Sequence, residues 1–488
     1  MERGPGLRRS RPAVVADVVR RSAPTAAILL AVVGLVAVGL AVVGTAGTAT
    51  GGGVPWPAAI APIAASVSHD RGLAFVRPVP VHFVTPRTFD RDVAAQTAPT
   101  SAATRTDDRR YAAELRALGL LDGSVNVIAA ETATDESGGV LGYYTPTARA
   151  VYLRGKALTP AVRVTLAHEL THALQDQHFG LNRLSRHAVT DGEQFGLTAL
   201  EEGDAVLDED DYQATLTPAE RRQATAQPTT TGSTSSGSTS TTVPVLTVTS
   251  SVPYVLGPEL VNALYAVGGN ARVDRAYARP PATELDVLQP TDYLERAGTR
   301  SVPAPVVPAG DRADGGPQTF GAFTLYLTLA ARLPAHTALA AADQWAGGSM
   351  RQYRTASGRS CLTAELTGRS AAGTAALASA VSTWAAAMPA GQVTTNAGAG
   401  PTATATATAP VVELTACDPG PPARAGPETL ERALTVASQR NGIEVDALYA
   451  GASPAVAACV GRRALADRAL LVHGTAARVR RATGRCSP

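Results

Sequence analysis

The sequence predicts an α+β fold that is mostly helical and two-lobed, follows a single N-terminal transmembrane helix, and ends in a disulfide-containing C-terminal region. Three observations predict this arrangement. An uncharged apolar run at residues 26–46 is long enough to span a bilayer. Helical periodicity dominates the rest, with a β-hairpin pattern at residues 140–154. All 4 cysteines lie after residue 360 of the 488-residue chain.

Residues 1–70 predict a membrane anchor and its flanks. Residues 1–25 are rich in arginine, whereas no formally charged residue occurs from Ser22 to His69. By the positive-inside rule the arginine-rich end stays in the cytoplasm and the rest is exported. We therefore expect a cytoplasmic basic tail at 1–25, a transmembrane anchor at 26–46 and a flexible stalk at 47–70. A cleaved signal peptide is the alternative, and the absence of a nearby cysteine excludes a lipoprotein anchor.

Residues 71–222 are expected to form the first lobe. Its expected elements are an edge strand at 74–84, a helix at 110–121, a strand at 126–130, and hairpin strands at 140–144 and 150–154. The hairpin lies just before a long predicted helix. An extended peptide could therefore pair with its edge strand beside that helix.

The stretch at residues 166–179, LAHELTHALQDQHF, carries an H-E-x-x-H motif made by His168, Glu169 and His172. On a helix, this spacing puts both imidazoles on one face, one turn apart, where they can bind a single Zn²⁺. Glu169 then lies beside the metal as a general base acting on water. A chance occurrence in a surface helix is the alternative, and it is rare in a chain with only 8 histidines.

Independent signals predict a helix at this motif. Thr159 followed by Pro160 is typical of an N-cap with a first-turn proline, and Gly180 stands where a helix ends. Apolar residues recur at helical spacing between them. His178 lies on a different face from the motif histidines, so we interpret it as a capping or core residue.

A catalytic zinc needs a third protein ligand and one open position. Two carboxylates in the segment ALEEGDA, Glu201 and Glu202, compete for that place. The helix that carries them would begin at one of two N-caps: Asp191 with Gln194, or Thr190 with Glu193.

Further acids surround these candidates. Asp204 or Asp191 is a candidate to orient a zinc-binding histidine through a hydrogen bond. The run DEDD at residues 208–211 is interpreted as a solvated acidic face, with a calcium site as the alternative.

These motifs resemble the gluzincin division of zinc metallopeptidases, in which the glutamate of an E-G-x-A stretch is the third zinc ligand. The resemblance implies a zincin-like, two-lobed peptidase domain with Glu202 as that ligand and Glu201 as the runner-up. Segments at residues 140–155, 253–269 and 279–294 also resemble a set of uncharacterised, membrane-anchored bacterial proteins with HELTHALQDQHF and E-G-D-A motifs. This resemblance covers residues 72–347.

The chain departs from those proteins at several positions. Gln289 stands where they have a histidine, so a side chain assisting the oxyanion there would donate a neutral hydrogen bond instead of a charged one, and a zinc enzyme of reduced activity is expected. The alternative is that Gln289 is an ordinary turn residue. Ser349 replaces an aspartate, and Val206 stands where a supporting carboxylate is expected.

The remaining chain falls into three expected parts. Residues 223–251 form a Ser/Thr-rich tract, too polar to bury a core, that we interpret as a disordered insertion. Residues 252–349 predict a helical second lobe, with helices at 253–267, 270–278 and 317–333. Residues 350–488 predict a separate C-terminal region, interrupted by a flexible Ala/Thr tract at 396–409.

The cysteines predict disulfides in the C-terminal region. Four cysteines in an exported segment allow three pairings, and we expect Cys361 with Cys417 and Cys459 with Cys486. A second zinc site is not expected, because none of them has C-x-x-C spacing.

Together these features predict a membrane-anchored zinc metallopeptidase whose catalytic domain lies on the extracytoplasmic side and acts on a peptide or protein substrate. A formal net charge of +2 gives no reason to expect a nucleic acid partner. One alternative is an envelope binding or scaffold protein that keeps the fold without turnover. Another is a zinc hydrolase of a different bond.

Overall fold

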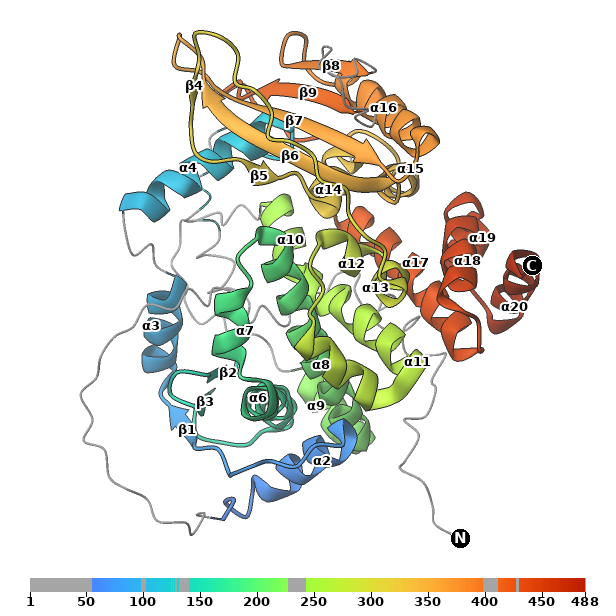
Figure 1. Cartoon of the computed structure of the whole chain (residues 1–488). Helices are drawn as coiled ribbons and strands as arrows, with labels where there is room; N and C mark the ends of the chain where they lie inside the picture. Colours follow the sequence, from blue (N-terminus) through green and yellow to red (C-terminus); the bar gives the residue numbers. More distant parts are fainter. Residues whose placement is uncertain are drawn as a thin grey trace.

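The computed structural model describes residues 55–97, 102–123, 140–226, 243–397, 411–426 and 430–487, together with residues 125, 127 and 130. A three-stranded sheet and a six-stranded sheet lie at opposite ends of the molecule, with helices between them (Figure 1). Helices outnumber strands among the described elements. The predicted fold class, α+β and mostly helical, is therefore confirmed.

The expected tail and anchor, residues 1–46, lie outside the described residues. Within the part of the chain that the structure describes, no helix is both long enough and apolar enough to cross a membrane. The stalk prediction is wrong for residues 61–70, which belong to helix α2 (Ala61–Arg71). Ile63 and Val67 of this helix are buried. The alanine-rich segment is therefore a helix and not a flexible stalk, because it has a high helix propensity and an apolar side that packs on a core.

The three-stranded sheet lies within residues 71–222, the expected first lobe. Its strands are β1 (Val81–Val84), β2 (Gly142–Thr145) and β3 (Ala150–Arg154). β3 lies in the middle, parallel to β1 and antiparallel to β2, which confirms the predicted hairpin and makes β2 an edge strand. Helices α3 (Pro86–Thr97) and α6 (Pro160–Phe179) pack against this sheet.

Helix α6 has the ends that the sequence predicts. Thr159 is its N-cap and accepts a hydrogen bond from the Val162 amide at 3.3 Å. Gly180 ends it in the left-handed conformation with φ of 72°, which glycine adopts at little cost. Leu166, Leu170 and Leu174 are fully buried in a small hydrophobic core shared with α2 and β3. This core fixes one side of the helix and leaves another side for the motif histidines.

Helix α8 (Asp191–Thr215) begins at a capping box in which Thr190 and Glu193 cap each other, so the second of the two predicted starts is confirmed. Leu197 and Leu200, near its start, pack in the large core of the molecule. Tyr212, near its end, packs in the small core around α6. The middle of α8 therefore crosses the boundary between the two cores.

A close helix contact lies in that middle part. A Cβ atom on Gly203 would stand only 2.2 Å from the backbone of Gly257, the first residue of α11 (Gly257–Ala278). Only glycine allows the two helices to approach so closely. The glycine of the E-G-D-A motif thus sets the position of α8 beside the second lobe.

The structure corrects several predicted boundaries. The strand expected at 126–130 lies mainly outside the described residues, and the described Val127 and Ala130 are helical. Residues 227–242 of the Ser/Thr tract also lie outside them. The tract prediction is wrong at both ends, since residues 223–226 and 244–251 are helical. The helices of this part are α4 (Ala102–Ala117), α7 (Leu181–His187), α9 (Pro218–Ala226), α10 (Pro244–Val255), α12 (Glu284–Leu288) and α13 (Pro290–Glu295).

Helix α11 is kinked at Gly268 and Gly269, where the sequence predicts a break between two helices. The helix expected at 317–333 is shorter than predicted, because a two-residue strand comes first. The elements from here to the C-terminus are β4 (Arg312–Ala313), β5 (Gln318–Thr319), α14 (Ala322–Ala330), α15 (Ala335–Ala342), β6 (Trp345–Arg354), β7 (Ser360–Gly368), α16 (Ala371–Ala386), β8 (Val393–Ala397), β9 (Val412–Cys417), α17 (Leu430–Tyr449), α18 (Pro454–Ala466), α19 (Arg468–Val472) and α20 (Ala476–Cys486).

The C-terminal part shares its core with the second lobe. The expected boundary between residues 349 and 350 falls inside strand β6. Leu260 of α11, Leu325 of α14 and Ala437 of α17 all belong to one hydrophobic core. The six-stranded sheet has the order β4-β6-β7-β9-β8, with β5 also paired to β6. Most of the flexible tract expected at 396–409 lies outside the described residues.

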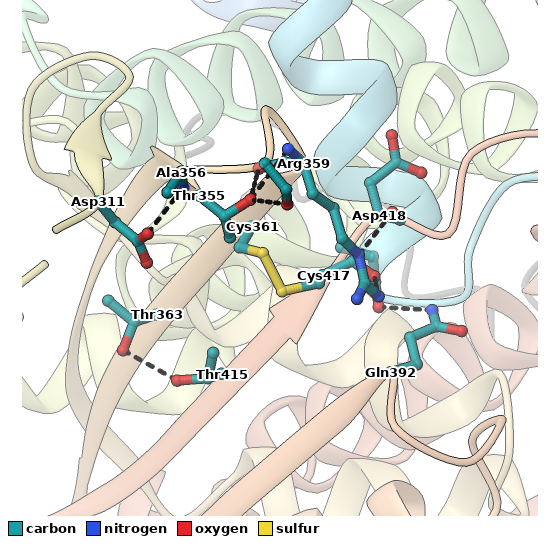
Figure 2. Close-up of a disulfide and its surroundings, with 12 residues drawn as sticks. Asp311, Thr355, Ala356, Arg359, Cys361, Thr363, Gln392, Thr415, Cys417 and Asp418 are labelled. Carbon is teal, nitrogen blue, oxygen red and sulfur yellow. Dashed lines mark hydrogen bonds between the residues drawn. A yellow bond between two sulfur atoms is a disulfide. The ribbon is translucent and has the colours of Figure 1, made fainter. Parts of the chain in front are cut away.

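Both predicted disulfides are present. Cys361 and Cys417 lie directly opposite each other on neighbouring strands β7 and β9, and Figure 2 shows the bond between them. Cys459 and Cys486 connect α18 to the end of α20. No free cysteine occurs among the described residues.

Candidate metal centre

Helices α6 and α8 bring His168, His172 and Glu202 together, and we call these three residues the metal group. Nε2 of His168 lies 3.1 Å from Nε2 of His172 and 3.1 Å from Oε2 of Glu202. Nε2 of His172 lies 3.3 Å from the same carboxylate oxygen. Three ligand atoms from two helices therefore converge on one point, and this group could hold a metal ion.

The opposite nitrogen of each imidazole is already engaged. Nδ1 of His168 donates a hydrogen bond to Oε2 of Glu209 at 3.0 Å. Nδ1 of His172 donates to the amide oxygen of Gln175, also at 3.0 Å. Neutral imidazoles held in this way turn their unprotonated Nε2 atoms toward each other and toward the Glu202 carboxylate. Such a set of acceptors needs a cation between them, either protons or a metal ion.

The electrostatics agree with this description. Burial opposes the charged form of His168, but the hydrogen bonds to Glu202 and Glu209 outweigh it and raise the His168 pKa well above its usual value. The pKa of His172 is raised in the same way by Glu202, against the effect of burial. Burial would raise the pKa of Glu202, but the two histidines lower it overall. Each partner thus favours the charged form of the other.

The group contains Glu202 and not Glu201. Glu202 is buried and bonded to both histidines, whereas Glu201 is half-buried and its Oε1 has no hydrogen-bond partner among the residues that the structure describes. Burial raises the pKa of Glu201 to about 8, so this neighbouring carboxyl tends to keep its proton. The order of preference that the sequence suggests between these two residues matches the geometry.

Glu169 is buried beside the metal group. Its Oε2 accepts a hydrogen bond of 2.7 Å from the backbone amide of Tyr144 on the edge strand β2. Burial raises the Glu169 pKa, while the nearby His168 and His172 oppose that shift. The Tyr144 hydroxyl donates to Asp176, two turns further along α6. Tyr144 therefore joins the edge strand to the metal-bearing helix at two points.

Tyr254 on α10 is a neighbour of the metal group that the sequence did not reveal. Its ring stacks on His168 with centroids 6.4 Å apart, and its hydroxyl hydrogen-bonds to Glu202. Burial and the carboxylates of Glu202 and Glu169 raise its pKa well above the usual value, so the hydroxyl stays protonated. No spacing rule connects Tyr254 to a motif more than eighty residues earlier, because the contact depends on how α10 crosses α8.

The structure corrects two predictions about the acidic segment. Glu209 bonds directly to His168, because it lies seven residues after Glu202 and therefore on the same face of α8, whereas Asp204 reaches His172 only through Gln175. Asp208 and Glu209 are buried toward α6 and not solvated, with Thr171 donating to Asp208 at 3.3 Å. The seven-residue spacing between Glu202 and Glu209, which is two helical turns, is a sequence signal that could have identified Glu209.

Other predicted residues lie elsewhere. His178 is exposed in the last turn of α6 and bonds to the carbonyl of Ala74, outside the metal group. Gln289 is buried where α12 ends. Among the described residues its Oε1 has no hydrogen-bond partner, and no hydrogen bond joins Gln289 to the metal group. Ser349 lies in β6 opposite Glu365.

Comparisons with protein families, with curated proteins and with solved structures found no match to this chain.

Proposed function

We propose that the protein is a zinc metallopeptidase in which His168, His172 and Glu202 hold the metal. The observation that carries this proposal is the convergence of two imidazole nitrogens and one carboxylate oxygen, separated by 3.1 to 3.3 Å. A tetrahedral zinc site with ligand bonds of about 2.0 to 2.1 Å has ligand-to-ligand distances of about 3.3 Å. Two histidines and one glutamate also leave a fourth position open, as in catalytic zinc sites.

Bound Zn²⁺ would supply Lewis-acid activation of water and of the scissile carbonyl. Glu169 would take a proton from the attacking water and pass it to the leaving amine. The Tyr144 amide, bonded to Oε2 of Glu169, holds this carboxylate toward the metal group. The raised pKa of Glu169 suits a group that must both accept and release a proton.

Tyr254 is the group that we assign to the developing oxyanion. Its hydroxyl lies beside Glu202 and stays protonated, so its single proton could turn from Glu202 to a negatively charged oxygen of the substrate. Gln289 would then not be needed for this task. The absence of a histidine at position 289 therefore need not make the enzyme slow.

The substrate would be a peptide in an extended conformation. Within the described residues, β2 pairs only with β3, so its outer edge can accept another strand. Tyr144 of β2 bonds to Glu169, which places that edge next to the proposed base. The two disulfides support an exported catalytic domain, and the apolar run at residues 26–46 supports a membrane anchor.

The proposal can be tested with a fluorogenic peptide library and the full-length protein loaded with zinc. We expect cleavage that disappears in Glu169→Gln while zinc remains bound. Cleavage that persists unchanged in that variant would contradict the role of Glu169. Zinc binding without any cleavage would favour the alternative, a peptidase-like binding or scaffold protein.

A further inference from the structure

Behind His172, a chain of buried polar side chains runs away from the metal group toward helix α2. Gln175, Asp204 and Arg71 are its members, and none of them touches the position where a metal would lie. We propose that this chain sets the tautomer of His172 and makes α2 part of the metal centre. The inference rests on the proposed function, because it assumes that the metal group binds zinc.

The amide of Gln175 is the first link. Its Oε1 accepts the hydrogen bond from Nδ1 of His172 at 3.0 Å. Its Nε2 donates to Oδ2 of Asp204 at 3.1 Å and to the backbone carbonyl of Glu201 at 3.0 Å. Asp204 and the Glu201 carbonyl are both acceptors, so they require the NH₂ end of the amide on their side. The oxygen end must then face His172.

This orientation decides which nitrogen of His172 is free. An amide oxygen can only accept, so Nδ1 of His172 must carry the proton and Nε2 must offer its lone pair to the metal group. A flipped amide would present NH₂ to Nδ1 and move the proton to Nε2. The imidazole would then offer no lone pair to a metal at that place.

Asp204 keeps its acceptor role because it is held as a carboxylate. Nε of Arg71 donates to Oδ2 of Asp204 at 2.8 Å, and the Tyr277 hydroxyl donates to the same oxygen at 3.0 Å. Arg71 and Asp204 are both almost completely buried, and Arg71 also bonds to Asp274 at 2.8 Å. A buried ion pair of this kind holds a fixed geometry only while both partners are present.

Arg71 is the last residue of α2, so the chain connects the metal group to the first described helix. Asn270 strengthens this attachment by donating to the carbonyl of Asp70 at 3.0 Å. The first strand that the sequence predicts begins after Leu73, and a protein shortened to that strand would lose Arg71 with the rest of α2. Asp204 would then remain as a buried charge without its main partner. Gln175, Asp204 and Arg71 are therefore positioning residues, and α2 is required for full zinc affinity.

The test measures the zinc dissociation constant of the full-length protein by competition with a chromogenic chelator. Gln175→Leu removes the acceptor of Nδ1 of His172, so the tautomer is no longer fixed and zinc affinity should fall about 10- to 100-fold. Gln175→Glu is the conservative variant, because a protonated carboxyl group can accept from Nδ1 of His172 and donate to Asp204, as the amide does. Its zinc affinity should therefore stay closer to the wild-type value than that of Gln175→Leu. Arg71→Met leaves Asp204 without its cation and should also lower zinc affinity.

Tyr277→Phe is the matched control, because it removes a bond to the same oxygen of Asp204 without changing what Gln175 requires. Its zinc affinity should stay close to that of the wild type. The inference is overturned if Gln175→Leu or Arg71→Met binds zinc as tightly as the wild type, or if Gln175→Glu binds as weakly as Gln175→Leu. A general loss of folding would leave Gln175→Glu as weak as Gln175→Leu and so would also count against it. Absence of zinc binding by the wild-type protein would instead overturn the proposed function.

Discussion

Two clusters of buried carboxylates in this protein have their negative charge compensated in different ways. In the C-terminal part, the fully buried Arg440 bonds to Asp343 at 2.8 Å and lies 3.7 Å from Glu444. At the metal group, Glu202 and Glu209 bond to histidines, and no arginine or lysine among the described residues is bonded to either. The first cluster contains its own permanent cation, whereas the second depends on protons or on a metal.

The difference indicates which cluster has a function beyond structure. A buried carboxylate needs a compensating charge, because transfer from water to the protein interior is costly. Arg440 provides that charge at all physiological pH values and also donates to the carbonyl of Leu288. We call its cluster closed, because it needs no added cation. The metal group ends in lone pairs that converge on one point, so it is open to an added cation.

The largest expected effect comes from Glu169→Gln. This change removes the proposed base beside the metal group, which is the open cluster. It keeps the shape of the side chain at position 169 and leaves the three ligands intact. We expect peptide hydrolysis to fall about 10²- to 10⁴-fold, since general base catalysis contributes that much, with zinc affinity retained. Steady-state kinetics with parallel metal analysis would measure both. Glu201→Gln is the control, because this neighbouring carboxyl lies outside the metal group and should be dispensable.

A substitution in the closed cluster should lower the stability of the fold and leave metal binding unchanged. Arg440→Met leaves Asp343 and Glu444 without their cation, so we expect a loss of about 3 to 5 kcal/mol in the free energy of unfolding. Urea denaturation would measure this loss, and zinc content should be unchanged in the folded protein. Arg480→Met, at an exposed arginine of α20, serves as the control. A loss no larger than in that control would contradict the comparison.

Glu259 represents a third case, a buried carboxyl that forms no ion pair with any described residue. Ser438 bonds to one of its oxygens, the other has no hydrogen-bond partner within the described part of the chain, and burial raises the Glu259 pKa from 4.5 to about 8. The folded state then keeps a proton that the unfolded state loses, so this group stabilises the fold least at high pH. Its contribution is fully present below pH 4.5 and is lost as pH rises to about 8.

Glu259→Gln should remove this dependence. Stability relative to the wild type should increase between pH 5 and pH 8, by at most about 1.4 kcal/mol per pH unit. Urea denaturation at both pH values would measure it, with Glu431→Gln, at an exposed site, as the control. An equal effect of Glu259→Gln at both pH values would show that Glu259 is charged in the folded protein.

The smallest effect on metal binding is expected for Tyr254→Phe, which leaves all ligands in place, although loss of the proposed oxyanion donor should also lower peptide hydrolysis about 10²-fold. Loss of the hydrogen bond to Glu202 should weaken zinc binding on the order of tenfold, because bonds to charged groups contribute about 1.5 kcal/mol or more. Chelator competition would measure it. Tyr265→Phe on α11 is a suitable comparison, since Tyr265 lies outside the metal group. Equal affinities in the wild type and Tyr254→Phe would remove Tyr254 from the centre.

The parts of the site that one helix encodes could be predicted from the sequence. Thr159, Pro160 and Gly180 mark the ends of α6, and the spacing of His168 and His172 needs only helical geometry. The residues that support the ligands depend on where other helices cross α6. Gln175 and Tyr254 acquire their roles from α8 and α10, and no local pattern records those crossings.

The same reasoning explains the errors in the fold. A flexible composition hid α2, because its stability comes from packing and from Arg71, 133 residues from its partner Asp204. The acidic run at residues 208–211 looked solvated because charge was counted along the chain and not around the helix. The disulfide pairings, by contrast, followed from pairing each cysteine with its neighbour in the sequence.

The most direct test of the open cluster is the zinc content of the full-length protein after chelator treatment and reloading. It should be measured beside Glu202→Ala and Glu201→Ala. We predict one zinc ion per chain in the wild type and in Glu201→Ala, and loss of zinc in Glu202→Ala. A folded wild-type protein that takes up no zinc, or a Glu202→Ala variant that binds it equally well, would contradict the account.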